Sequence, residues 1–343
     1  MFPEPGHPLM HPWALRVAAT LRLSDLMAEG LSHPEQLAAR SGAHAGSLER
    51  LLRYLVCRGC FTEPEPGRFA LNEQGETMLS DHPSGLRGHL DFDGPFGRTD
   101  QAISHLLSTV RTGRSAYAQV HGRSFFDDLA DDPERSAVFD DMMSRRLAMD
   151  LPHLLGAYDW AGVDSVADIG GGTGDLLAAL LAAHSHLRGT LVERPLTAER
   201  AARSLREKGS AGRCEVVAGD FFAPLPPGRR VYVLRNVLHD WDDERATAIL
   251  RNCRRAAGHD GRILVVEMVM GDGEDALAAT AHDLFMMLVF DSAERDLGQF
   301  GRLAEDAGLR LAATSPLPSG SWLLELVPAT TSSEPAPATA SSP

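Results

Sequence analysis

The chain has 343 residues, 43% of them hydrophobic, and its 33 Lys and Arg against 47 Asp and Glu give a formal net charge of −14. This length favours more than one domain. The negative charge argues against nucleic acid, which proteins bind by neutralising phosphates with basic side chains. No apolar run approaches the roughly 18 residues of a membrane helix, and the first residues lack a secretory signal. We therefore expect a cytoplasmic protein that handles small molecules, without nucleic-acid or membrane partners.

Residues 1–97 have the element order of a winged helix. Helical periodicity covers residues 10–60, and two short extended runs then flank a Pro/Gly turn in FTEPEPGRFALNEQG. In a DNA-binding protein the segment HAGSLERLLRYL would contact DNA, but apolar and acidic residues surround its Arg50 and Arg53, and the turn is acidic. A structural or dimer-forming domain is therefore favoured over a DNA-binding one.

Cys57 and Cys60, in the same region, have the C-x-x-C spacing of some zinc and redox sites. They lie in an apolar helical pattern with no second pair of thiol or His ligands nearby. We expect buried, reduced cysteines near a helix end and no metal.

A helix-rich segment, residues 98–158, links this domain to the rest of the chain. A helix between two domains commonly lines the cleft between them, so Met142 and Met143 are candidate substrate contacts. At the far end, residues 329–343 consist mostly of Ser, Thr, Pro and Ala, a composition typical of a disordered tail.

Strands and helices alternate from residue 159 to residue 328. The predicted strands are 165–169, 189–193, 214–220, 231–237 and 262–269. This alternation predicts an α/β, Rossmann-like domain with a parallel sheet covered by helices on both faces. Ligands of such folds bind at the carboxyl ends of the strands.

The first of these strands ends in the loop Asp168-Ile-Gly-Gly-Gly-Thr-Gly174, which opens a helix. Gly170, Gly172 and Gly174 allow the backbone to approach a ligand closely, and the helix N-terminus adds N–H donors. The dinucleotide-binding pattern needs a small residue where this chain has Leu177. A carboxylate before the loop would repel phosphates, but it attracts the cationic amino-acid end of S-adenosylmethionine. The loop therefore favours this methyl donor.

Acidic residues at the next two strand ends fit the rest of a nucleoside. Glu193 ends the second strand, where an acid can accept hydrogen bonds from both ribose hydroxyls. Asp220 ends the third strand and can accept a hydrogen bond from an adenine amino group. Phe221 or Phe222 would then form a wall for the adenine ring.

The motifs VADIGGGTG, LVERP, AGDFF and LRNVLHDWDDE, in this order and spacing, resemble the plant-type (caffeate-like) small-molecule O-methyltransferases. Bacterial members of that family modify aromatic natural products. The resemblance spans nearly the whole chain and implies a winged-helix dimerisation domain followed by a Rossmann-like methyltransferase domain. It also implies S-adenosylmethionine as cofactor, a homodimer whose N-terminal domain helps close the partner's substrate pocket, an aromatic phenolic substrate and no metal.

The resemblance assigns roles to residues near the fourth and fifth strand ends. His239 falls on the catalytic base, Glu267 on the acid that orients this His, and Glu294 on a second acid beside it. The neighbours of the base carry binding roles: Asp240 for the substrate, Trp241 near the adenine and Arg235 for the cofactor.

Two segments depart from the family pattern. Asp291-Ser-Ala-Glu-Arg-Asp296 replaces the common Gly-Gly-(Lys/Arg)-Glu-Arg-Thr, and Gly258-His-Asp-Gly261 replaces Pro-Gly-Gly. The first departure alters a loop expected to line the acceptor pocket and the second is a turn variation.

A His base suits methyl transfer to oxygen. A phenol has a pKa of about 10 and is mostly neutral at pH 7, so a base must remove its proton, a contribution of roughly 10²–10⁴-fold in rate. A carboxylate on the other ring nitrogen fixes the tautomer. In the helical run AHDLFMMLVF, we expect one face to form an apolar wall for the acceptor and two polar residues to contact it. These substrate candidates are Met286, Met287, Phe290, His282 and Asp283.

Three alternatives remain open. One is a family member that binds S-adenosylmethionine but performs decarboxylation or hydroxylation, which the presence of His239 and Glu267 disfavours. Another is a winged-helix regulator with a ligand-sensing domain, which lacks the expected basic recognition helix. The third is an NAD(P)-dependent oxidoreductase, which Leu177 disfavours.

Overall fold

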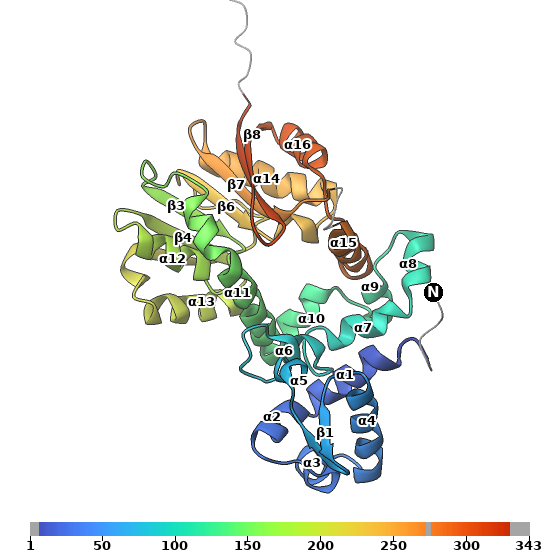
Figure 1. Cartoon of the computed structure of the whole chain (residues 1–343). Helices are drawn as coiled ribbons and strands as arrows, with labels where there is room; N and C mark the ends of the chain where they lie inside the picture. Colours follow the sequence, from blue (N-terminus) through green and yellow to red (C-terminus); the bar gives the residue numbers. More distant parts are fainter. Residues whose placement is uncertain (1–6, 272–275, 330–343) are drawn as a thin grey trace, which may run out of the picture.

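The computed structural model describes residues 7–271 and 276–329 (Figure 1). The predicted disordered tail therefore lies outside the described residues, except for Ala329. The described chain forms a helical N-terminal part and an α/β domain, and the long helix α11 (Pro133–Gly156) runs between them. None of the described helices is both long and apolar enough to cross a membrane.

The N-terminal part has the predicted order of helices followed by a hairpin. Its elements are α1 (Met10–Thr20), α2 (Leu23–Ala28), α3 (Pro34–Ser41), α4 (Ala45–Cys57), β1 (Thr62–Glu65), β2 (Arg68–Ala70) and α5 (Glu73–Glu76). Leu37, Leu52 and Phe69 are fully buried in its core. Both cysteines of the C-x-x-C pair are free, as expected, but only Cys60 is buried. The expectation of a buried Cys57 was wrong, because this last residue of α4 faces outward.

The linking segment is helical, as predicted, but it also packs against a distant part of the chain. After α6 (Leu86–Leu90), its helices are α7 (Gly97–Ile103), α8 (Leu106–Thr112), α9 (Ala116–His121), α10 (Phe125–Asp131) and α11. Helix α15 (Ala276–Phe290) lies against α7, α8 and α9 (Figure 1). Their shared core contains Tyr117, Phe125 and Leu288. The space between the linking helices and the α/β domain is therefore closed on one side by segments that are far apart in sequence.

The α/β domain contains a seven-stranded sheet of order β5-β4-β3-β6-β7-β9-β8. The strands are β3 (Ser165–Ile169), β4 (Arg188–Glu193), β5 (Cys214–Ala218), β6 (Val231–Arg235), β7 (Arg262–Met268), β8 (Leu309–Pro316) and β9 (Ser321–Pro328). The first five are parallel, as predicted. The two last strands, which were not predicted, add an antiparallel hairpin beside β7. The order reverses next to β3, and ligands bind at such a switch point.

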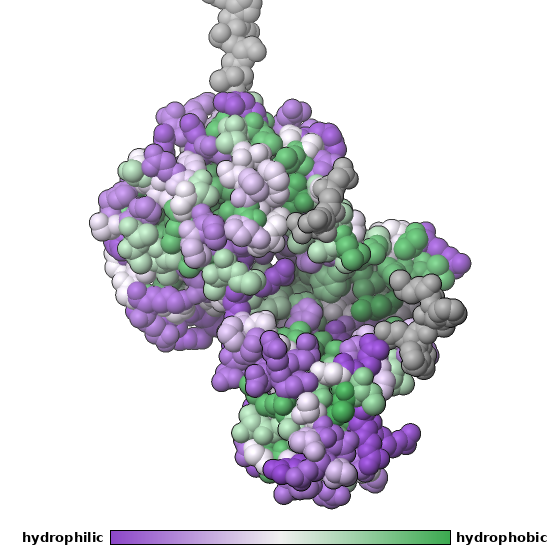
Figure 2. Space-filling model, in the orientation of Figure 1, coloured by the Kyte–Doolittle hydropathy of each residue, from purple (hydrophilic) through white to green (hydrophobic). Residues whose placement is uncertain are grey.

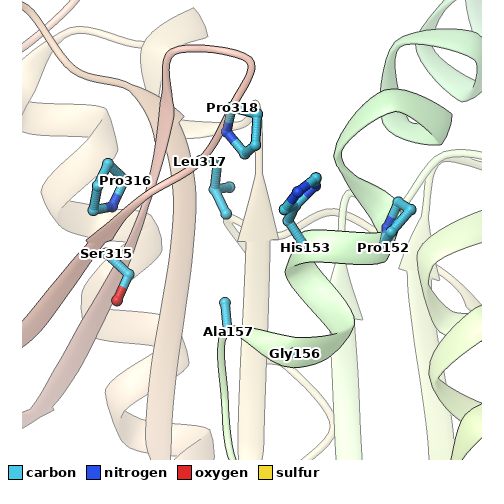
Figure 3. Close-up of a pocket in the computed structure, with 8 residues that line it drawn as sticks. All are labelled: Pro152, His153, Gly156, Ala157, Ser315, Pro316, Leu317 and Pro318. Atoms are coloured by element: carbon cyan, nitrogen blue, oxygen red, sulfur yellow. The ribbon is translucent and has the colours of Figure 1, made fainter.

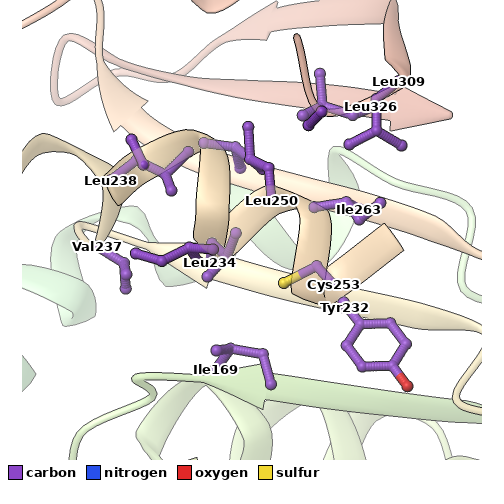
Figure 4. Close-up of a cluster of buried hydrophobic side chains, with 14 of the residues drawn as sticks. Ile169, Tyr232, Leu234, Val237, Leu238, Leu250, Cys253, Ile263, Leu309 and Leu326 are labelled. Atoms are coloured by element: carbon purple, nitrogen blue, oxygen red, sulfur yellow. The ribbon is translucent and has the colours of Figure 1, made fainter. Parts of the chain in front are cut away.

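Helices cover both faces of this sheet. They are α12 (Asp175–Ala183), α13 (Pro195–Glu207), α14 (Asp243–Ala257) and α16 (Leu297–Asp306), with short 3₁₀ turns at Ala211–Arg213 and Leu238–Asp240. On one face Tyr232, Leu234 and Ile263 of the strands pack against Leu250 and Cys253 of α14 (Figure 4). The buried strands hold their carboxyl ends at one common edge.

Leu177 of α12 shows how this sheet differs from a dinucleotide-binding one. The side chain is fully buried, and a Cβ atom on the facing Gly189 of β4 would lie 2.8 Å from it. Close packing of helix on strand is therefore achieved by a glycine on the strand, whereas dinucleotide sites place the small residue on the helix.

Candidate active site

A cavity of about 710 Å³ lies at the carboxyl ends of the strands, between the α/β domain and helices α11 and α15. Its volume is within the usual range for small-molecule sites. It is lined by most of the predicted site residues, namely Met142, Met143, Asp168, Gly170, Gly172, Glu193, Asp220, Phe221, Phe222, Arg235, His239, Asp240, Trp241, His282, Met286 and Phe290.

A second depression lies elsewhere, between the end of α11 and the β8–β9 turn (Figure 3). Pro152, Pro316 and Pro318 form much of it, and His153 is the one titratable side chain among its lining residues. Because it has no cluster of polar groups and lies away from the carboxyl ends of the parallel strands, we place the active site in the larger cavity.

Asp168 marks the polar end of this cavity. It is 2% exposed, and neither carboxylate oxygen has a hydrogen-bond partner among the described residues. Burial raises its pKa to about 7, opposed by the nearby Arg235. A Cβ atom on Gly171 would lie 2.4 Å from its carboxyl group, so the middle glycine of the loop is required for space. A buried acid without a partner fits a cationic ligand group such as the amino group of S-adenosylmethionine.

Arg235 and Asp150 lie beside this acid. Nη2 of Arg235 is 3.9 Å from Oδ2 of Asp150, and Nε of Arg235 and Oδ1 of Asp150 are buried without partners in the described chain. Both signs of charge are thus available for a zwitterionic amino-acid group. Asp150, on α11, was not predicted, because nothing near it in sequence marks a binding site.

Glu193 and Asp220 lie at adjacent strand ends. Oε2 of Glu193 accepts a hydrogen bond from the backbone N–H of Arg194 at 2.6 Å, and burial raises the pKa of this acid. Asp220 is exposed and accepts from the N–H of Phe222 at 2.8 Å. Both carboxylates face the cavity and are placed to accept ligand hydroxyl or amino hydrogens.

Aromatic rings form the wall beside them. Trp241 makes edge contacts with Phe221 and Phe222 at centroid distances of 5.9 and 4.9 Å. On its other side it stacks on Phe126 of α10 at 6.3 Å, and the guanidinium of Arg194 lies 5.0 Å from that same ring. Phe126 was not singled out from sequence, where it is one Phe of a helix core pattern.

His239 lies in the 3₁₀ turn after β6, against two buried acids. Its Nδ1 is 2.9 Å from Oε1 of Glu294 and 3.7 Å from Oε2 of Glu267. Oε1 of Glu267 instead accepts hydrogen bonds from the N–H groups of Val237 and Leu238. Glu294, expected as the second acid beside His239, therefore bonds the ring, whereas Glu267, expected to orient the ring, holds the backbone of the turn.

The charge of this cluster sets the protonation of His239. Burial by itself lowers the pKa of the ring, but the carboxylates of Glu267, Asp240 and Glu294 outweigh it and raise the pKa to about 10. Burial favours the neutral form of Glu294, yet hydrogen bonds from His239 and His282 lower its pKa to about 2. Glu294 is therefore ionised and His239 is a stronger base than an ordinary His.

Arg295 holds the same turn and was not predicted. This side chain is almost fully buried. It donates to the carbonyls of Leu238 and Trp241 at 2.9 and 2.7 Å, and to Asp243 at 2.9 Å. The two carbonyls flank His239, so Arg295 fixes the backbone that carries the ring. In the sequence AERD, nothing except its position after Glu294 marks Arg295 as a residue of the site.

The cavity-facing side of α15 includes His282, Met286 and Phe290 but not Asp283 or Met287. Each residue turns a helix by about 100°, so positions one residue away face elsewhere. Asp283 accepts a hydrogen bond from the N–H of Glu294 at 2.8 Å and supports it from behind. Gly174 is also outside the lining and caps α12. For these three residues the geometry does not support direct ligand contact.

The loop after α15, which departs from the family's sequence pattern, begins with Asp291. This residue has φ of 58°, a left-handed conformation that glycine usually supplies and that Asp tolerates. Its Oδ1 accepts a hydrogen bond from the N–H of Ser115, whose hydroxyl donates to the carbonyls of Leu288 and Val289. The substitution thus ties the end of α15 to α9 where the family commonly has glycine.

Comparison with known proteins agrees with this geometry. Residues 7–81 match the O-methyltransferase dimerisation domain and residues 103–310 match the O-methyltransferase domain. The 2,7-dihydroxy-5-methyl-1-naphthoate 7-O-methyltransferase of Streptomyces carzinostaticus is 46% identical over 309 residues, 90% of this chain and 92% of that protein. The aclacinomycin 10-hydroxylase RdmB of Streptomyces purpurascens is 43% identical over 311 residues, 89% and 83% of the two chains.

Among solved structures, the O-methyltransferase NcsB1 from neocarzinostatin biosynthesis, in complex with S-adenosylmethionine and 2-hydroxy-5-methyl naphthoic acid, superposes with a TM-score of 0.87. It is 45% identical, and the match covers 93% of this chain and 96% of that one. The chain therefore belongs to the O-methyltransferase family. It is an S-adenosylmethionine-dependent O-methyltransferase, and the predicted family, fold class and cofactor are confirmed.

Proposed function

We propose that this enzyme methylates a phenolic hydroxyl of an aromatic natural product, with His239 as general base and without a metal ion. The observation that carries the proposal is the hydrogen bond from Nδ1 of His239 to Glu294. It leaves Nε2 as the ring nitrogen available to an acceptor in the cavity. The naphthoate methyltransferase and the naphthoate-bound structure described above support an acceptor of fused aromatic rings.

Different residues of the cavity would bind the cofactor and transfer the proton. Asp168 would hold the amino group of S-adenosylmethionine, Glu193 its ribose, and Asp220 with the aromatic wall its adenine. The cofactor supplies an electrophilic methyl group. Neutral His239 then accepts the phenol proton, and because its pKa lies near that of a phenol, this transfer is close to thermoneutral. Glu294 stabilises the imidazolium formed.

Metal independence rests on how the polar groups are paired. Within the described chain, His239, His282 and Glu294 form the one cluster with the spacing of metal ligands. Both ring Nδ1 atoms lie 2.8–2.9 Å from the same oxygen of Glu294, which two hydrogen bonds explain.

The decisive experiment incubates the enzyme with S-adenosylmethionine and a panel of naphthols and polycyclic phenols, with and without EDTA. Mass spectrometry should show products heavier by one CH₂ group in both conditions. A second candidate, hydroxylation, is favoured by the 43% identity to the aclacinomycin hydroxylase. Products heavier by one oxygen atom instead would select that candidate, and loss of turnover in EDTA would contradict metal independence.

The raised pKa of His239 predicts an alkaline pH profile. The base form of the ring is required, so kcat/KM should rise with pH up to a pKa of about 10. In the Glu294→Gln variant one carboxylate is removed while an oxygen remains to accept from Nδ1, so the pKa falls and the rising limb moves to lower pH. Both enzymes are assayed on the same phenol, whose own ionisation is then common to both. An unmoved limb would contradict the assignment.

We also propose that the enzyme is a homodimer, with residues 1–97 as dimerisation domain, 98–158 as linking helices and 159–328 as methyltransferase domain. Large apolar side chains are exposed on α1 and α8, including Trp13, Leu107 and Val110. Hydrophobic residues gather on this side of the molecule in Figure 2. Light scattering after gel filtration should give twice the chain mass of 37.0 kDa, and Leu107→Glu with Val110→Glu should yield monomers. A monomeric parent protein would refute the proposal.

A further inference from the structure

Helix α15 brings a second histidine to the carboxylate that orients the catalytic one. Nδ1 of His282 is 2.8 Å from Oε1 of Glu294, the same oxygen that bonds Nδ1 of His239. The two imidazole rings lie nearly parallel, at 17°, with centroids 5.9 Å apart. Because Glu294 is ionised, it accepts from both rings, and each Nδ1 carries a proton. Each ring therefore has Nε2 as its remaining nitrogen.

His282 lies on the face of α15 that borders the acceptor end of the cavity, with Phe285, Met286 and Phe290. Its side chain is 22% exposed. Among the contacts of the described residues, Nε2 of His282 has no hydrogen-bond partner. A polar ring nitrogen in an otherwise apolar wall is thus open to a ligand atom.

We propose that His282 binds a second hydroxyl of the acceptor, on the ring carbon next to the one that carries the methylated hydroxyl. The inference rests on the proposed function and narrows its substrate to dihydroxylated aromatic rings. In its neutral form the ring, with its proton on Nδ1, accepts at Nε2, and the ligand group it binds there is a donor. An ionised carboxylate cannot donate, and the ionised Glu294 would repel it.

The test measures binding by calorimetry in the presence of S-adenosylhomocysteine, with 2,3-dihydroxynaphthalene and 2-naphthol as matched probes. The wild-type protein should bind the diol about tenfold more tightly, the effect of one hydrogen bond and above the twofold statistical advantage of two equivalent hydroxyls. Equal affinities would overturn the inference. So would tighter binding of 3-hydroxy-2-naphthoic acid than of the diol, which would assign His282 to a carboxylate.

Two variants separate ligand binding from support of Glu294. An Asn side chain can donate to Glu294 as Nδ1 does but has no atom at the Nε2 position, whereas Gln reaches that position. His282→Asn should reduce the preference for the diol to about the statistical value, and His282→Gln should retain part of it. The reverse order would show that His282 acts only through Glu294. Binding preference without methylation of either probe would instead refute the proposed function and leave the His282 assignment standing.

Discussion

The His239→Asn variant is expected to lose methyl transfer by roughly 10²–10⁴-fold in kcat, the range for removal of a general base. Asn can still donate to Glu294 as Nδ1 of His239 does, at 2.9 Å in the native protein. The buried carboxylate thus keeps a partner, and the variant lacks only the nitrogen that accepts the phenol proton. The measurement is the steady-state kcat for methylation of a naphthol at saturating S-adenosylmethionine.

Cofactor affinity provides the control for this variant. His239 belongs to the turn after β6, whereas the carboxylates assigned to the nucleoside end β4 and β5. The Kd of S-adenosylhomocysteine, measured by calorimetry, should therefore change less than twofold or so, an effect below 0.5 kcal/mol. Turnover equal to the wild type would exclude His239 as the base. A parallel loss of cofactor affinity would show that the turn itself had collapsed.

The second large effect is expected for Glu193→Gln, which should weaken S-adenosylhomocysteine binding by about 10²-fold. Hydrogen bonds to a charged group contribute about 1.5–3 kcal/mol each, and an amide can no longer accept from both ribose hydroxyls. The residue is partly buried at the end of β4 and lines the cavity, where a bound ribose would take the place of the solvent around it. Calorimetric titration gives the Kd directly.

The Glu215→Gln variant, on the neighbouring strand, is the control for a general effect of removing one negative charge. Glu215 of β5 is exposed and pairs with Arg229 at 3.3 Å, away from the cavity. Glu215→Gln should leave the Kd of S-adenosylhomocysteine as it is in the wild type. If both variants bind equally well, Glu193 does not hold the ribose. Thermal unfolding in the absence of ligand identifies any variant that is simply misfolded.

Several site residues were predictable because a local pattern marks them. Asp168, Glu193 and Asp220 each end a strand of the alternating region, and parallel strands bring their carboxyl ends to one edge. His239 follows the fourth strand by the same rule. The hairpin of β8 and β9 was missed, since much of β8 is exposed and lacks a continuous apolar run.

Other residues could not be found this way, because their partners are distant in sequence. Arg295 binds the carbonyls of Leu238 and Trp241, more than fifty residues earlier. Asp150 reaches Arg235 from α11, and Phe126 reaches Trp241 from α10. Backbone carbonyls and isolated aromatic rings leave no pattern in a sequence. Only the packed chain shows what they contact.

The sequence by itself determined the order of strands and helices, the acids at the strand ends and the family, because each is encoded in short runs of neighbouring residues. The tertiary structure alone decided that Glu294, not Glu267, bonds His239, and that His282 shares the same oxygen. Both acids are compatible with the family motif, and the choice depends on how α15 packs beside the sheet. The packing places Nδ1 of His239 2.9 Å from Glu294 and 3.7 Å from Glu267, and only the shorter distance allows a hydrogen bond from the imidazole ring.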